Sequence, residues 1–178
     1  DYNDASDKWV QRGSDINGVR ANDQFGYSVS INGDGSIIAV GAPNNDDGPG
    51  NNSGHVRVFE WNGTAWVQLG IDINGEANGD QNGRSVSLNK NGDILAIGAI
   101  NNDAGPGNNS GHVRVFEWDI PTSTWVQLGI DINGEANGDQ SGWSVSLNND
   151  GDILAIGAPN NDDGPGNNSG HVRVFEWN

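Results

Sequence analysis

The sequence lacks cysteine and methionine, and only eight of its 178 residues are lysine or arginine. The absence of cysteine excludes disulfide bonds and thiol chemistry. With 24 acidic residues the formal net charge is −16, which makes contact with nucleic-acid phosphates or an anionic membrane unfavourable. No apolar run approaches the length of a membrane span. We therefore expect no nucleic-acid partner and no membrane insertion.

Sustained helical periodicity is missing as well. Instead, 28 glycines and many Asn and Asp residues separate short apolar runs, a spacing typical of all-β proteins. A hydrophobic content of 33%, with seven tryptophans, is enough to build a core. Because the chain begins at Asp1 and contains no Met, we expect a processed protein or a piece of a larger one.

Three copies of one unit, residues 28–61, 85–118 and 144–177, make up most of the chain. Their equivalent histidines, His55, His112 and His171, lie 57 and 59 residues apart. A repeat of this length is one supersecondary unit that buries its apolar faces only against its neighbours. We divide the chain into a flexible lead-in, 1–7, and repeats over 8–61, 62–118 and 119–178.

Each repeat contains four runs that predict strands: d (WVQR or WVQL), a (SVSI or SVSL), b (IIAVGA or ILAIGA) and c (HVRVFEW). A glycine after Asn or Asp between strands a and b predicts a tight hairpin. Strand b is apolar on both faces, so we expect it in the centre of a sheet. By strand direction, the d–a and b–c loops emerge on one face of the array and the a–b and c–d turns on the other.

One run of landmarks, Phe25-Gly26, then Gly41-Ala42-Pro43, then GHVRVF over 54–59, resembles the FG-GAP repeat of integrin α-subunit β-propellers. The other copies depart from it at Asn82, Ser141 and Ile100. The resemblance implies an all-β β-propeller of four-stranded antiparallel blades, three of them in this chain, with strand a at the axis and strand d outermost. It also implies an extracellular or cell-surface location.

Propellers need about four to eight blades to close. Here a lone strand d, residues 9–12, precedes the first repeat, and the last repeat ends at Trp177 without an outer strand. We expect two chains to associate head to tail, each lending residues 9–12 to the other, as a homodimer that closes a six-bladed ring without an open sheet edge. The rival interpretation is a fragment of a longer propeller.

Calcium is the one cofactor that the sequence suggests, and none is required. The a–b turns lack the first and last carboxylates of the integrin calcium pattern, so they are interpreted as plain hairpins. The d–a loops alternate oxygen ligands, although the first repeat has Val19 in place of the glutamate. The alternative is that these side chains cap turns. The calcium candidates are Asp72, Asn74, Glu76, Asp80, Asp131, Asn133, Glu135 and Asp139.

The face formed by the d–a and b–c loops predicts an acidic, amide-rich rim able to hydrogen-bond sugar hydroxyls or gather cations. Beside it one position varies between the repeats and tunes either specificity or packing. For the histidines we expect a structural role, an imidazole bonded to a neighbouring loop. The predicted ligand-face residues are Tyr27, Arg84, Trp143, Asn44, Asp46, Asp47, Asn101, Asp103, Asn160, Asp162 and Asp163.

These observations favour a non-enzymatic extracellular module for adhesion or recognition, with a protein or glycan as its partner. Strand a offers chiefly Ser, Val, Ile and Leu at the axis, and no nucleophile elbow or phosphate loop is present. Two other classes stay open: a lectin with repeated carbohydrate sites, and a structural spacer in a larger surface assembly.

Overall fold

The structure, a computed structural model, describes residues 8–164 and 166–178. The predicted lead-in, 1–7, lies outside the described residues. The regular structure in this part of the chain is entirely β, with thirteen strands. Within the same residues there is no helix long and apolar enough to cross a membrane.

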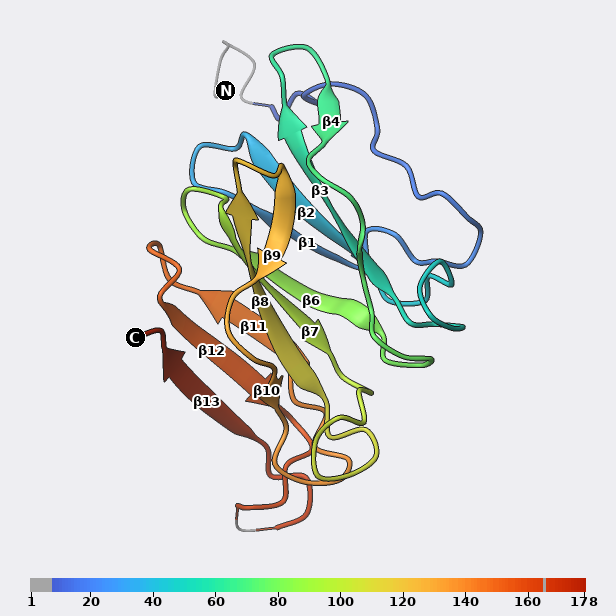
Figure 1. The fold of residues 1–178 in the computed structure, drawn as a ribbon, viewed down its shortest axis with the longest axis vertical. Coiled ribbons are helices and arrows are strands. Elements are labelled where there is room, and N and C mark those ends of the chain that lie inside the picture. Colours follow the sequence, from blue (N-terminus) through green and yellow to red (C-terminus); the bar gives the residue numbers. More distant parts are fainter. Residues whose placement is uncertain (1–7, 165) are drawn as a thin grey trace.

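The strands form three antiparallel sheets, which follow one another from blue to red in Figure 1. The first contains β1 (Ser28–Ile31), β2 (Ile37–Ala42), β3 (His55–Trp61), β4 (Trp66–Gln68) and β5 (Ile73–Asn74). The second contains β6 (Asn82–Leu88), β7 (Ile94–Ala99), β8 (His112–Asp119), β9 (Thr124–Gln127) and β10 (Ile132–Asn133). The third contains β11 (Ser144–Leu147), β12 (Ile153–Ala158) and β13 (His171–Glu176).

Strands a and b form the predicted hairpins, and strand b is central in every sheet. In the first turn the side-chain oxygen of Asn32 accepts hydrogen bonds from the amides of Ser36 and Ile37, at 2.9 and 3.0 Å. The a–b turns of adjacent sheets also bond to each other, as Gly33 N donates to Lys90 O at 2.8 Å. These bonds keep the a–b turns together on one face.

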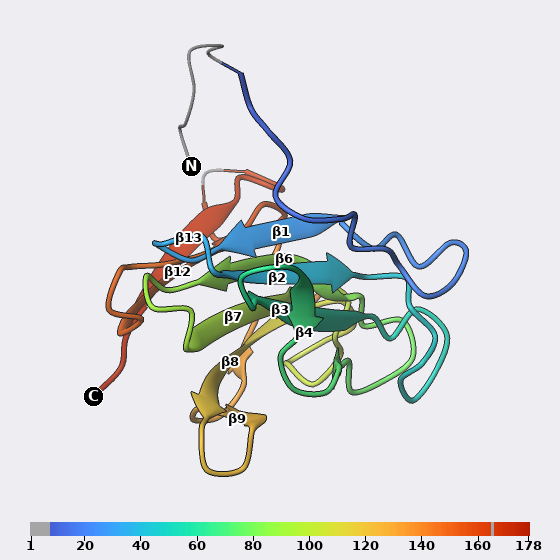
Figure 2. The same ribbon diagram turned by 90° about the horizontal axis from the view of Figure 1, so that it is seen from above.

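Strands β1, β6 and β11, the three copies of strand a, hold the sheets together at their inner edge. Figure 2 shows β1 lying beside β6. Ser28 Oγ donates to the carbonyl of Gly83 at 2.7 Å, and Ser30 Oγ accepts from the amide of Leu88 at 2.9 Å. The small polar side chains of strand a thus bond the next sheet, while the apolar faces of the sheets form two cores. One core lies around Val58 and Leu95, the other around Val113 and Ile156.

The outer edge of the first two sheets differs from the prediction of one strand d. Two short segments, β4 and β5, both pair with β3, and β9 and β10 pair with β8 in the same way, so each sheet has five strands. The third sheet has three. The strand predicted at 9–12 forms no ladder, because none of the described segments lies beside it as a partner. The first and second sheets each take their outer strands from the start of the next sequence repeat.

The first and third sheets each leave one apolar face uncovered. Val29 is 61% exposed on the first sheet, whereas its equivalent in the second sheet, Val86, is 9% exposed. Val172 is 67% exposed on the third sheet, whereas Val113 is fully buried. The two open faces are opposite faces of the repeat, so they are complementary: one is the face that a repeat turns to its predecessor, the other to its successor.

Candidate functional site

Three side chains from equivalent positions of the three repeats meet on one face. The guanidinium carbon of Arg84 lies 4.4 Å from the ring centroid of Tyr27 and 4.2 Å from that of Trp143. A cation over an aromatic face is stabilised by about 0.5 to 1 kcal/mol at an exposed site. We call this arrangement the arginine clamp. It unites the three variable residues predicted beside the rim.

Each clamp residue follows a tight turn that begins at a glutamine. The amide of Arg84 donates to the carbonyl of Gln81 at 3.1 Å, and the other two repeats make the same bond. The third residue of this turn, Gly83, has a φ of +87°, a conformation typical of type II turns that glycine adopts without strain. The turn therefore keeps the glycine of the FG dipeptide even where Asn82 replaces its Phe.

A hollow of about 360 Å³ opens beside the clamp. It is also lined by Gln24, Gln81, Gln140, Asn44 and Asn101. The side chain of Gln140 accepts a hydrogen bond from Asn160 at 2.7 Å and donates one to Asn101 at 3.4 Å, joining two b–c loops. The three glutamines have φ values of 57°, 57° and 54°, which are uncommon for residues other than glycine. The hollow thus presents amides and aromatic rings around one cation.

The carboxylates predicted for the ligand face lie outside this hollow. Three of them accept a 2.6 Å hydrogen bond from a backbone amide six residues later in their own loop: Asp46, Asp103 and Asp162. Asp47 forms a salt bridge with Arg20 at 2.6 Å. Asp163 lies beside Glu135 and His171. The expected acidic rim is thus separate from the amide-rich hollow.

A buried pair of side chains joins the d–a loop to the b–c loop in every repeat. Asn102 Nδ2 donates to Asp80 Oδ2 at 3.0 Å, and both residues are almost fully buried. The same oxygen of Asp80 accepts from the amide of Ala77 at 2.9 Å. The equivalent pairs are Asn45 with Asp23 and Asn161 with Asp139. Two calcium candidates, Asp80 and Asp139, therefore fasten both loops to one face, as the strand directions predicted.

The other calcium candidates of each loop contact different neighbours. Gln68 Nε2 donates to Asp72 at 2.7 Å, and the backbone carbonyl of Asn74 accepts from Arg114 at 2.7 Å. The next repeat has the same bonds to Asp131 and Asn133. Across the described residues, groups of three carboxylate or histidine side chains with ligand atoms within 4.8 Å of one another occur at two places, and neither group comes from a single loop. Calcium binding by one d–a loop stays a prediction.

Each histidine begins a strand c and lies against the d–a loops. His112 Nδ1 is 3.8 Å from Glu76 Oε2 and 3.9 Å from Asp131 Oδ2. Burial, followed by the positive charge of Arg114, lowers the pKa of His112 to about 4, so the imidazole is neutral at pH 7. Burial also raises the pKa of Glu76, an effect that Arg114 opposes. The second group contains Glu135, Asp163 and His171.

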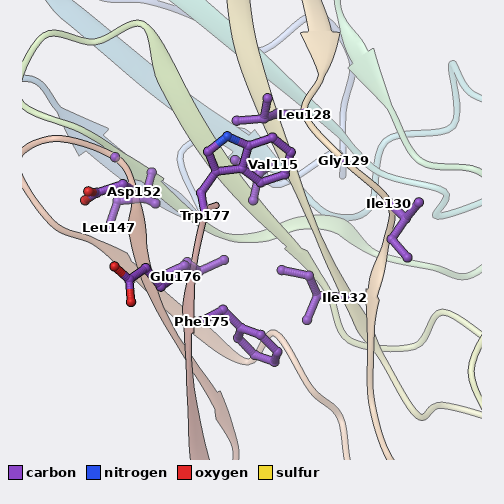
Figure 3. A pocket seen from close by; sticks show the side chains of 12 residues that line it. Val115, Leu128, Gly129, Ile130, Ile132, Leu147, Asp152, Phe175, Glu176 and Trp177 are labelled. Atoms are coloured by element: carbon purple, nitrogen blue, oxygen red, sulfur yellow. The ribbon is translucent and has the colours of Figure 1, made fainter.

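An apolar pocket of about 210 Å³ lies between the second and third sheets (Figure 3). Leu128, Phe175 and Trp177 line it. One repeat earlier, the corresponding place is filled by Trp125, which packs on the core, lies 5.4 Å from Trp118 and donates to the carbonyl of Leu69. The pocket therefore has the lining of a tryptophan site.

The fold and the site place the chain in the class of all-β repeat proteins. Its repeated antiparallel sheets are joined at their first strands, and a hollow lies on the loop face. Residues 17–59 and 133–175 match the family model of the FG-GAP repeat, so the chain contains FG-GAP repeats at these two positions, and the predicted resemblance is confirmed. Together these findings indicate a repeat module of β-propeller type. No curated protein matches the chain by sequence.

Solved structures with a similar fold include a protein from Bacteroides uniformis named as a candidate 6-phosphogluconolactonase. It is 14% identical with a TM-score of 0.55, and the match covers 85% of this chain and 36% of that one. The WD40 repeats of RRP9 are 16% identical with a TM-score of 0.48, over 85% of this chain and 42% of that one. The match thus spans less than half the length of these structures, and the first likeness concerns the fold alone.

The glutamines of the hollow and the three Asn–Asp pairs were not predicted from the sequence. A signal for the glutamines exists: each repeat places Gln three residues before the variable position, with glycine between them. The pairing of Asp80 with Asn102 joins residues 22 positions apart, a separation that neither strand nor helix periodicity reveals.

Proposed function

We propose that the chain is a non-enzymatic extracellular recognition module that binds its partner at the arginine clamp. One observation carries the proposal: three repeats, otherwise nearly alike, place three different side chains, Tyr27, Arg84 and Trp143, in one stack beside a hollow. FG-GAP repeats are typical of extracellular and surface proteins. Binding sites of such modules combine rigid aromatic anchors with a few placed polar groups.

The chemistry of the hollow points to a partner with an anionic group. Arg84 is the single charged residue among the described residues that line it. In a chain of net charge −16, this guanidinium is an isolated attractive point for a carboxylate or sulfate. The amides of Gln81 and Asn101 beside it offer both donors and acceptors.

A carbohydrate partner is the second candidate, favoured by the aromatic rings and amides of the same hollow. Ring faces pack on the apolar faces of sugars, and amide groups bond hydroxyls. A glycan bearing a carboxylate would use all three features. A purely structural spacer would need none of them.

The test is a glycan array, followed by binding measurements on any hit, with Arg84→Ala. We expect a loss of at least about tenfold in affinity, the equivalent of one charge-assisted bond. Arg20→Ala is the matched control, because it removes the same charge from an exposed ion pair away from the hollow. If both substitutions lowered the affinity equally, the clamp would serve packing and not ligand binding.

We also propose that a second copy completes the third sheet through residues 9–12. Trp66 pairs with Trp61 across β3 and β4, and its indole donates to the carbonyl of Arg12 at 3.0 Å. Trp9 is the equivalent of Trp66 and is fully exposed, while Trp177 is the equivalent of Trp61. Trp9 of one copy fits the apolar pocket beside Trp177 of another.

The open faces support the same head-to-tail arrangement. Val29 and Ile31 would pack on Val172 and Val174 of the other copy, as Val86 packs against the first sheet here. Two such contacts close a ring of six sheets. Sedimentation velocity at micromolar concentration tests this: a dimer is expected, lost in Trp9→Ala and kept in Lys8→Ala. A monodisperse monomer of the unmodified chain would contradict it.

A further inference from the structure

The imidazole of His112 has a buried, unpaired nitrogen close to the loop face. Its side chain is 1% exposed, and Nδ1 has no hydrogen-bond partner. Leaving a buried polar atom unpaired is unfavourable because the atom loses its hydration without gaining a partner, so such an atom requires an explanation. The nearest groups that Nδ1 faces are Glu76 and Asp131, both too distant for direct hydrogen bonds.

Three chain segments bring these donor atoms together. Glu76 follows β5, His112 begins β8, and Asp131 directly precedes β10. One ligand atom from each of Glu76, His112 and Asp131 lies within 4.8 Å of the other two. Metal–ligand bonds of about 2.0 to 2.2 Å in a tetrahedral site place donors about 3.3 to 3.6 Å apart. The carboxylates are 40% and 26% exposed, so small side-chain rotations would close the remaining gap.

The far oxygen of each carboxylate is already engaged. Arg114 Nη1 contacts Glu76 Oε1 at 3.5 Å, and Gln127 Nε2 donates to Asp131 Oδ1 at 2.8 Å. These contacts turn the near oxygens, Oε2 and Oδ2, towards His112. Outer bonds of this kind orient the ligands of metal sites in general.

We propose that Glu76, His112 and Asp131 bind a divalent cation of the zinc class, with a fourth position open to water. A neutral imidazole nitrogen beside two carboxylates suits zinc, which accepts N and O ligands in tetrahedral sites. Calcium prefers six to eight oxygens. The proposed site takes Glu76 and Asp131, both calcium candidates, from two different d–a loops and adds a histidine nitrogen, so it differs from a calcium site formed within one loop. The proposal is independent of ligand binding at the clamp.

The repeats provide internal comparisons. In the third repeat Glu135, His171 and Asp163 form a similar but more exposed group. In the first repeat His55 Nδ1 lies 3.5 Å from Asp72, and its own Nδ1 is also unpaired, but Val19 stands where the other repeats have glutamate. The first repeat therefore lacks one of the three ligands.

Calorimetric titration of the full chain with zinc chloride tests the site. The titration is carried out on a chain that carries Glu135→Gln, because this substitution removes a ligand from the third-repeat group. We expect one equivalent of zinc, bound more tightly than calcium or magnesium. Glu76→Gln and Asp131→Asn should each weaken binding by at least about tenfold. Asp72→Asn, a carboxylate beside the incomplete first-repeat site, should leave it unchanged.

Val19→Glu should add a second equivalent by completing the first-repeat site at an exposed position. Circular dichroism of each variant, matching the parent spectrum, keeps folding separate from binding. The proposal is overturned if the parent takes up no zinc, if Glu76→Gln binds as the parent does, or if Asp72→Asn loses binding to the same extent. A Val19→Glu chain that gains no equivalent would overturn the role given to the glutamate.

Discussion

Trp125 Nε1 donates a hydrogen bond of 3.1 Å to the carbonyl oxygen of Leu69, which follows the outer strand of the preceding sheet. Trp66 makes the same bond to Arg12 at 3.0 Å. The first and second sheets are therefore joined at their outer edges by the indole of Trp125 as well as at their inner edges by a serine hydroxyl, and Trp66 holds the segment 9–12 in the same way. The repeat specifies both joints in its own sequence, which explains how nearly identical units stack without a connecting domain.

Trp125→Ala should lower the free energy of unfolding by about 3 kcal/mol, because it removes a large ring from the core and leaves the Leu69 carbonyl without this donor. Urea unfolding of the dilute chain measures the change. Trp9→Ala is the control, since the side chain of Trp9 is fully exposed; its effect should stay within about 0.5 kcal/mol. Equal effects would mean that the indole joint contributes little.

Asn102→Ala should cost about 1.5 to 3 kcal/mol, because it takes a charge-assisted bond from the buried carboxylate of Asp80. The same substitution at the exposed Asn108, in the same loop, should change stability by less than about 0.5 kcal/mol. Thermal unfolding compares the two. If Asn102→Ala left the stability unchanged, Asp80 would have sufficient hydrogen-bond donors in its own loop.

The two-residue alternation of side chains in the strands and the glycines in the turns predicted the regular part of this fold. The alternation of SVSL and the glycine after Asp or Asn in the turns lead directly to hairpins such as β11–β12, and the doubly apolar ILAIGA runs occupy the sheet centres. The outer edge could not be read in this way. Ile73 and Asn74 form β5 only because Val56 and His55 offer a free backbone edge, and residues 9–12, with the sequence of an outer strand, remain without a ladder for lack of one.

The candidate site was predictable in its location and less so in its chemistry. Strand direction placed Tyr27, Arg84 and Trp143 on the loop face, but their stacking depends on the close approach of β6 to its two neighbours. Charge was a poorer guide. Asp80 and Asp139 resemble metal ligands in sequence. In the structure each is buried and accepts a hydrogen bond from an asparagine of the next loop, so each joins two loops.

Arg84→Ala should destabilise the chain by about 1 to 2 kcal/mol, the sum of two cation–π contacts. The near-ultraviolet dichroism of Tyr27 and Trp143 should weaken as their rings lose a fixed neighbour. Arg84→Lys keeps the charge but lacks the planar group that stacks on rings, so its loss should be intermediate. A lysine variant as stable as the parent would indicate that charge alone, rather than stacking, holds the clamp.

Gly98→Ala and Gly157→Ala test the closeness of adjacent sheets with the same substitution in the same local sequence. A Cβ on Gly98 would lie 2.1 Å from the carbonyl oxygen of Gly142 in the next sheet, and backbone there has little room to move. A Cβ on Gly157 would meet only the side chain of Ser144 at 2.5 Å, which a rotation relieves. We expect a loss of about 1 to 3 kcal/mol for Gly98→Ala and a clearly smaller one for Gly157→Ala in the dilute monomer.

The difference between these two glycines also reports on assembly. If another sheet packs on the third one, as a second copy does in the proposed ring, Gly157 acquires a backbone neighbour like that of Gly98. Gly157→Ala should then weaken the dimer while leaving the monomer nearly unchanged, which sedimentation and unfolding measured at two concentrations would separate. Equal losses at Gly98 and Gly157 in the monomer would contradict the sheet spacing itself, because only the next sheet distinguishes the two positions.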